Sequence, residues 1–181
     1  MTTYIALLRG INVGGNNKIS MAELKIAFSE AGFVNVSTYI NSGNVIFSSS
    51  KNDANVKKDC EALIAKRFSL DIAVCIISAT ELAQALANAP DWWNKDKETK
   101  HNAMFVIAPN TAQDILDEMG EIKPKYEKIA FHGKLIFWSA PLATFSRTKY
   151  GTMASKAAYQ KVTVRNANTT RKLAKLTQSA S

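Results

Sequence analysis

The stretch "RGINVGG" at residues 9–15 combines an arginine, an asparagine and three glycines within seven positions. Glycines let backbone N–H groups approach an anion closely, and such loops cradle phosphate groups when a helix follows them. The spacing matches neither G-x-x-x-x-G-K-[ST] nor G-x-G-x-x-G, so the stretch is not a standard nucleotide-binding motif. Two interpretations stay open: an anion-binding loop, and a winding connection in which Gly10, Gly14 and Gly15 supply positive φ angles.

Side chains suited to acid–base or metal chemistry are sparse in this sequence. The two histidines, His101 and His132, stand far apart, and neither H-x-x-x-H nor C-x-x-C spacing occurs. Because metal sites need such clusters, we predict no metal and no cofactor. A G-x-S-x-G elbow is absent, and no Ser/His/Asp set is identifiable, so catalytic residues stay unassigned. An enzyme that works by positioning and anion stabilisation alone remains an alternative.

Charge is divided unevenly along the 181 residues. Residues 1–122 hold 11 Lys and Arg against 14 Asp and Glu, whereas residues 123–181 hold 12 against one, Glu127. Such a basic region attracts polyanions, which favours nucleic acid, a phosphorylated small molecule or an acidic protein as partner. The candidate residues for phosphate or nucleic-acid contact are Arg165, Asn166, Asn168, Arg171, Lys172 and Lys175. An ordinary solvated basic face is the alternative.

Hydrophobic periodicity predicts the order β-α-β-β-α-β twice. The expected strands are residues 3–8, 35–40, 45–49, 72–78, 102–108, 126–131, 134–139 and 161–164. The expected helices are residues 20–31, 52–69, 80–89, 109–120, a weak and broken one within 143–159, and 166–178. This order is typical of a duplicated ferredoxin-like α+β fold with antiparallel sheets and an extra C-terminal helix. We expect halves at 1–89 and 102–181 joined by a linker at 90–101, or one domain with a shared core.

The ferredoxin-like topology places the connection after the first strand beside the turn after the second. The segments "RGINVGGNNK" and "NSGN" should therefore meet at one end of the first sheet, near the start of the helix at 20–31. We call this end the Gly/Asn rim. Its candidate ligand-binding residues are Arg9, Gly10, Asn12, Gly14, Gly15, Asn41, Ser42, Gly43 and Asn44.

Tryptophan and cysteine residues give two further expectations. Trp92 and Trp93 could stack on bases beside nearby lysines, or could simply pack at the junction between the halves. Cys60 and Cys75 lie in apolar contexts, which predicts buried free thiols in a reducing cytoplasm. No apolar run is long enough to cross a membrane, and no signal peptide is recognisable. The oligomeric state is left open.

Four stretches, "IALLRGINVGG", "MAEL", "GF-x-x-V-x-TYI-x-SGNVIF" and "RNANTTRKLAKL", resemble a bacterial family of unknown function, numbered 1697. The resemblance implies the duplicated ferredoxin-like fold and a cytoplasmic protein, and it implies no established reaction. The resemblance places the family pattern on the rim residues other than Asn41, and on Thr163, Arg165, Asn166 and Thr169. From residues and resemblance together we expect a cytoplasmic binder of a phosphate-bearing ligand, nucleic acid first. The alternative is an enzyme acting on a small anionic or phosphorylated metabolite at the Gly/Asn rim.

Overall fold

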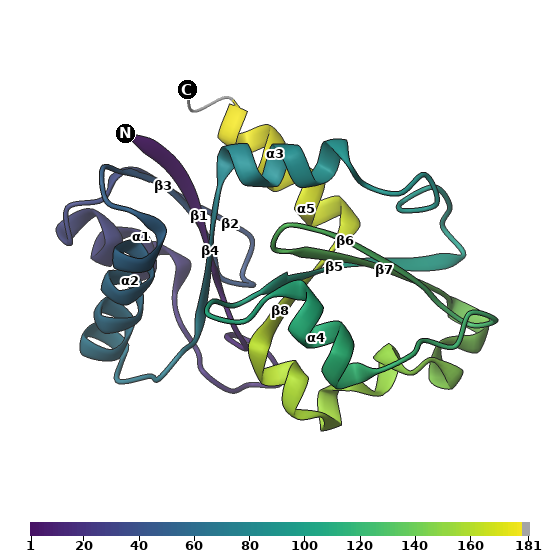
Figure 1. Ribbon diagram of the computed structural model, residues 1–181. Coiled ribbons are helices and arrows are strands. Elements are labelled where there is room, and N and C mark those ends of the chain that lie inside the picture. Colours follow the sequence, from purple (N-terminus) through teal and green to yellow (C-terminus); the bar gives the residue numbers. More distant parts are fainter. Residues whose placement is uncertain (179–181) are drawn as a thin grey trace. The chain divides into compact units, whose positions relative to one another are not determined.

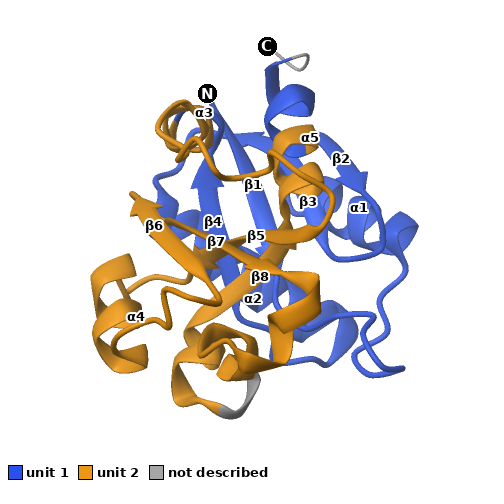
Figure 2. Cartoon of the chain, turned by 90° about the vertical axis from the view of Figure 1, so that its right-hand side faces the viewer, with its two compact units in different colours: residues 1–80, 173–181 blue, residues 81–172 orange. Residues whose placement is uncertain are grey.

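The computed structural model describes residues 1–178, apart from the side chains of residues 154 and 155 (Figure 1). Its elements cluster into two compact units (Figure 2). The first unit comprises Met1–Thr80 with Leu173–Ser181, and the second comprises Glu81–Lys172. The division into halves at 1–89 and 102–181 stays a prediction. The last three residues of the second expected half, 179–181, lie outside the described part.

The first unit has the predicted β-α-β-β-α-β order. Its elements are β1 (Thr2–Leu8), α1 (Met21–Glu30), β2 (Val34–Tyr39), β3 (Asn44–Ser49), α2 (Asp53–Phe68) and β4 (Val74–Ser78). The strands form an antiparallel sheet in the order β2-β3-β1-β4. Residues of α1 and α2, among them Leu24, Phe28 and Ile64, pack with Ala6 and Phe47 of the sheet in one apolar cluster. Burial of this helical stripe holds both helices on one face of the sheet.

The second unit repeats the strand pattern but lacks the second helix. Its elements are β5 (Thr99–Val106), α4 (Ala112–Met119), β6 (Lys128–His132), β7 (Leu135–Pro141) and β8 (Val162–Asn166). The sheet order is β6-β7-β5-β8, again antiparallel. Where the weak helix was expected within 143–159, the structure has three short 3-10 helices, Leu142–Arg147, Tyr150–Ser155 and Ala157–Lys161. The duplicated ferredoxin-like α+β fold is thus confirmed, with this local replacement.

Each sheet is followed in the chain by one further helix. Helix α3 (Ala79–Ala87) follows β4, and helix α5 (Ala167–Gln178) follows β8 directly, close to the predicted bounds of both. Asn166 caps α5, because its Oδ1 accepts a hydrogen bond from the Thr169 backbone N–H at 2.7 Å. No helix within residues 1–178 is long and apolar enough to span a membrane.

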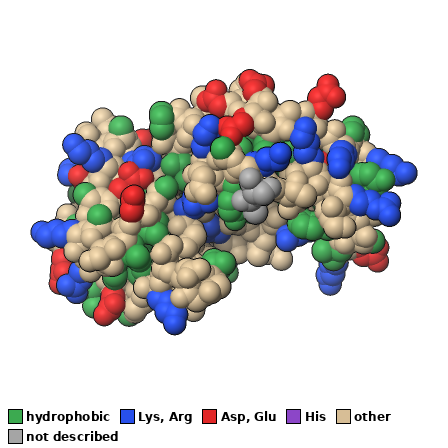
Figure 3. All heavy atoms as spheres, turned by 90° about the horizontal axis from the view of Figure 1, so that it is seen from below, with side chains coloured by type: hydrophobic (Ala, Val, Ile, Leu, Met, Phe, Trp, Pro, Cys, Tyr) green, Lys and Arg blue, Asp and Glu red, His purple; other side chains and the backbone are tan. Residues whose placement is uncertain are grey.

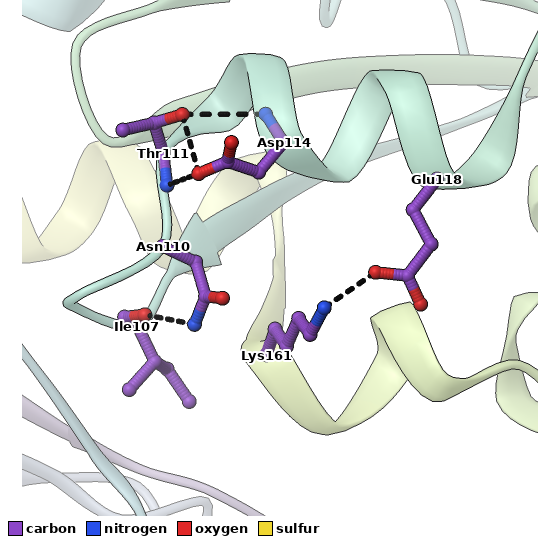
Figure 4. A network of polar contacts seen from close by, with 6 residues as sticks. All are labelled: Ile107, Asn110, Thr111, Asp114, Glu118 and Lys161. Carbon is purple, nitrogen blue, oxygen red and sulfur yellow. Dashed lines mark hydrogen bonds and ion pairs between the residues drawn. The ribbon is translucent and has the colours of Figure 1, made fainter.

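Local hydrogen bonds explain where α4 begins (Figure 4). The Thr111 Oγ1 accepts from the Asp114 N–H at 3.2 Å, and the Asp114 carboxylate accepts from the Thr111 N–H at 2.7 Å. This reciprocal capping box satisfies two N–H groups that the first turn would otherwise leave unpaired. Further along the helix, the Lys161 Nζ lies 2.6 Å from Glu118, which ties α4 to the end of the 3-10 segment.

Strand β5 begins earlier than the sequence predicts. Strand residues were expected from 102, and residues 90–101 were expected to be linker, yet Thr99, Lys100 and His101 pair with Pro141, Ala140 and Ser139 of β7. The polar composition of this stretch hides its strand character, because these residues gain their conformation from a partner strand about 40 positions away. The correction matters for function, since it places His101 inside a sheet.

Candidate functional site

The Gly/Asn rim forms as the topology predicts, and its amides hold it together. The Asn12 Nδ2 donates to the carbonyl oxygens of Ile19 and Asn41, at 2.9 Å each, and its Oδ1 accepts from the Ile19 N–H at 2.9 Å. The Leu8 N–H donates to the Gly43 carbonyl at 2.8 Å. The segment after β1 is therefore fastened onto the turn between β2 and β3.

Gly43 explains why the turn needs a glycine. Its φ is +76°, and a Cβ at this position would lie 2.7 Å from the Ile11 Cδ1 and 2.8 Å from the Leu8 Cβ. Asn44 beside it is fully buried, and its Nδ2 donates to the Tyr39 carbonyl and the Ser42 Oγ. These side chains shape the backbone of the rim, and the rim's ligand-binding role stays a prediction.

A cleft of about 560 Å³ lies in the second unit, at the start of α5. We call it the α5 cleft; it is lined by residues 94–97, 99–102 and 166–168. Two of the predicted phosphate-contact residues, Asn166 and Asn168, line it, and neither belongs to a conventional nucleotide-binding motif. Because the N-terminus of a helix carries partial positive charge, an anion in this cleft would be favoured.

His101 lines the α5 cleft and is buried. Its Nδ1 is 2.6 Å from the Oγ of Ser139, its cross-strand neighbour, and its side chain is only 4% exposed. The Nε2 has no hydrogen-bond partner, the one such buried side-chain nitrogen or oxygen among the described residues. Buried polar atoms without partners are rare in proteins and cost free energy. The Nε2 is therefore the candidate atom of this cleft for a hydrogen bond to a bound group.

Asp96 partly covers the orphaned nitrogen. Its Oδ2 lies 3.6 Å from the His101 Nε2, beyond hydrogen-bond length, and its Oδ1 accepts from the Thr99 N–H at 2.7 Å. Hydrogen bonds from Thr99, with a smaller effect of His101, hold the pKa of Asp96 below its usual value. Asp96, His101 and Ser139 thus lie together as a Ser/His/Asp group that no sequence motif predicts. Only the pairing of β5 with β7 brings Ser139 to His101, so spacing along the chain carries no signal for it.

Three lysines line the α5 cleft and are exposed: Lys95, Lys97 and Lys100. The Lys100 ammonium also lies 4.5 Å from the centre of the Phe145 ring. Figure 3 shows Lys and Arg side chains distributed over this face of the molecule, with Asp and Glu side chains among them.

The single carboxylate of residues 123–181, Glu127, is withdrawn from the surface. Glu127 is 2% exposed and accepts hydrogen bonds from the Trp138 indole and from the N–H groups of Lys123, Lys149 and Tyr150, at 2.7 to 3.1 Å. Residues 123–178 therefore expose no carboxylate of their own, although two of their lysines, Lys134 and Lys161, pair with Glu81 and Glu118 from earlier segments.

The remaining predicted contact residues differ in accessibility. Arg165 is buried on β8, where its Nη1 donates to the Thr163 Oγ1 and the Val164 carbonyl at 2.9 Å each. Arg171 lies with its guanidinium 5.4 Å from the Trp93 ring centre. Lys172 and Lys175 are exposed on α5 and outside the α5 cleft. Arg165 therefore contributes hydrogen bonds within the sheet, and its contact with phosphate stays a prediction.

A second cleft, of about 310 Å³, adjoins the α5 cleft and shares Lys95, Asp96, Thr99 and His101 with it. We call it the aromatic cleft, because Trp92 and Tyr126 line it. The neighbouring Trp93 has a different role from Trp92. It is buried, with its ring edge-on to Phe137 at 5.0 Å, and its Nε1 donates to the Asn102 carbonyl. The expectation of stacking on bases is therefore wrong for Trp93 and stays a prediction for Trp92.

Comparisons with known proteins agree with the fold and leave the function open. The chain resembles, at 31% identity and with a TM-score of 0.87, the solved "conserved bacterial protein SP0830 from Streptococcus pneumoniae", and the match covers 97% of this chain and 98% of that one. No curated protein matches the chain. The model of the family described as "Protein of unknown function (DUF1697)" matches residues 1–137. The chain therefore belongs to the DUF1697 family.

Proposed function

We propose that this protein binds a phosphate-bearing ligand at the α5 cleft, and that the ligand is nucleic acid. The observation that carries the proposal is the buried His101 side chain, whose Nε2 has no hydrogen-bond partner, in the lining of a cleft at the start of α5. If the Ser139 hydroxyl donates to Nδ1, the proton of the neutral imidazole resides on Nε2, where it can be donated to a phosphate oxygen.

Charge and helix geometry support the same ligand. Lys95 and Lys97 supply exposed ammonium groups in the lining of the cleft. The first turn of α5 contains no acidic residue. Amide side chains of Asn102 and Asn168 line the cleft as neutral hydrogen-bonding groups. Phosphate contacts in nucleic-acid complexes use these same groups: lysines, amides and helix N-termini. The cytoplasmic location expected from the sequence goes with this proposal.

A salt series tests the proposal directly. Fluorescence anisotropy with a labelled 20-nucleotide strand and the matching duplex should show affinity that falls steeply as salt rises. A Lys95→Gln, Lys97→Gln variant should bind more weakly and show a salt slope reduced by about one to two. The matched control is Lys25→Gln, Lys58→Gln, which removes two exposed lysines of α1 and α2. The proposal fails if neither polynucleotide binds at low salt, or if both double variants lose affinity equally.

An enzymatic alternative draws on one observation in the same cleft. The short His101–Ser139 contact and the nearby Asp96 could support proton transfer to or from a bound phosphorylated metabolite. The Gly/Asn rim gives less support to such a reaction, because the Asn12 and Asn44 amides are engaged in holding its loops. Turnover of a phosphomonoester by the protein, and its loss in His101→Gln, would favour the enzyme over the binding module.

A further inference from the structure

We infer that the nucleic acid is single-stranded, and that one unpaired base stacks on Trp92 in the aromatic cleft while its neighbouring phosphate lies in the α5 cleft. This inference rests on the proposed function and adds to it the strandedness of the ligand. It follows from two aromatic residues, two adjoining clefts and the cations around them.

The two clefts adjoin each other, because residues 95, 96, 99 and 101 line both. One end is polar and lies at the start of α5. The other end carries the aromatic rings of Trp92 and Tyr126. Trp92 lies before β5 in the chain, and Tyr126 lies just before β6. A nucleotide has the same division into an anionic phosphate and a flat apolar base, so a strand can occupy both clefts at once.

Like Tyr126, Trp92 has an aromatic surface available to a ligand. It is partly exposed at the aromatic cleft, whereas its neighbour Trp93 is 1% exposed and fixed against Phe137. A partly exposed tryptophan beside a hollow is typical of stacking platforms, because every base offers a π-face and the contact is independent of sequence.

Cations reinforce the aromatic cleft. The Lys125 Nζ and the Arg147 guanidinium lie 5.6 Å and 5.7 Å from the centre of the Tyr126 ring. Lys95 and Lys128 line the cleft as well, so charges for the phosphates on either side of a stacked base are present. Cations and stacking rings together form the combination by which proteins hold single strands.

Strandedness follows from access to the base. In a duplex the base faces are stacked on one another and only the edges are open, so a side chain cannot stack on them without unpairing. A protein that relies on Trp92 should therefore prefer a single strand to the duplex of the same sequence. A protein that relies on phosphate contacts alone should bind both.

The test uses the full chain with a 12-nucleotide labelled RNA, the matching DNA strand, its duplex, and a nucleoside monophosphate as competitor. Trp92→Leu keeps an apolar side chain and removes the π-face, whereas Trp92→Tyr keeps a stacking ring. Phe131→Leu is the matched control, because Phe131 is an exposed aromatic of β6 that lines neither cleft. Circular dichroism melts of each variant exclude unfolding as the cause of lost binding.

We expect Trp92→Leu to weaken single-strand binding by about fivefold or more, and duplex binding by much less. Trp92→Tyr and Phe131→Leu should bind like the parent protein, and strand binding should quench tryptophan fluorescence in the parent but much less in Trp92→Tyr. Equal affinities of Trp92→Leu and Trp92→Tyr, or a parent protein that prefers the duplex, would overturn the inference. Competition by the monophosphate at strand-like affinity would overturn it too, in favour of a small-nucleotide site.

The two proposals fail in distinguishable ways. If strand and duplex bind alike and the Lys95→Gln, Lys97→Gln variant still loses affinity, the α5 cleft binds phosphate and only the stacking inference is wrong. If no nucleic acid binds at low salt, both proposals fall together.

Discussion

Replacing Asn168 by Asp should stabilise the protein and weaken its ligand binding at the same time. Asn168 is exposed in the first turn of α5 and lines the α5 cleft. Asp has nearly the same shape, so the substitution adds one negative charge and little else. The first turn of α5 has no acidic residue at present, which leaves the N-terminal end of the helix dipole without a compensating side-chain charge.

The two effects have opposite signs for one physical reason. A carboxylate beside the positive end of a helix dipole stabilises the fold by about 0.3–1 kcal/mol. The same carboxylate repels a bound phosphate. At about 4 Å, two unit charges interact by about 1 kcal/mol in bulk water and about 4 kcal/mol near a protein surface, so a loss near the lower value is expected for an exposed group. We therefore expect affinity to fall by about fivefold or more.

The assay pairs urea denaturation with anisotropy at fixed salt. Asn55→Asp is the control, because Asn55 is exposed in the first turn of α2 and lines neither of the two clefts. It should be stabilised less, because Asp53 already lies in the first turn of α2, and it should bind like the parent protein. The reasoning is refuted if Asn168→Asp binds as tightly as the parent, or if both Asp variants lose affinity equally.

Three further predictions concern the folded framework. Glu127→Gln should destabilise the protein by about 2–4 kcal/mol in urea denaturation, because the new amide NH₂ would face N–H donors that now donate to the buried carboxylate. The control Glu121→Gln, at an exposed position, should change the free energy of unfolding by less than about 0.5 kcal/mol. Gly43→Ala should lower the free energy of unfolding by about 2–4 kcal/mol, because φ is positive there and the new Cβ would press against its neighbours. The control Gly32→Ala, where φ is positive but no atom is close, should lower it by about 1–2 kcal/mol. Equal losses in the two variants would contradict the packing argument. Burial and two flanking carboxylates raise the pKa of the Cys60 thiol, so Ellman's reagent at pH 8 should react with it only after unfolding, and a fast reaction in the native protein would contradict this burial.

The predicted elements were mostly right where their signals are local. Helix starts are local signals, because a cap such as Asn166 or Thr111 acts within three residues of itself. Short apolar runs located the strands, and their order was enough to place the loop after β1 against the turn after β2. The start of β5 was missed because its polar first residues take their conformation from β7, far along the chain.

The same distinction divides the candidate site. Residue types and short spacings are enough to predict the family, the duplicated element order, the basic C-terminal region and the position of "RNANTTR" at a helix start. The contact of His101 with Ser139, the burial of Glu127 and Trp93, and the position of Trp92 in a cleft appear only in the folded chain. These facts depend on strand register and on burial, which are set by contacts between residues distant in sequence, so no local pattern of side chains could reveal them.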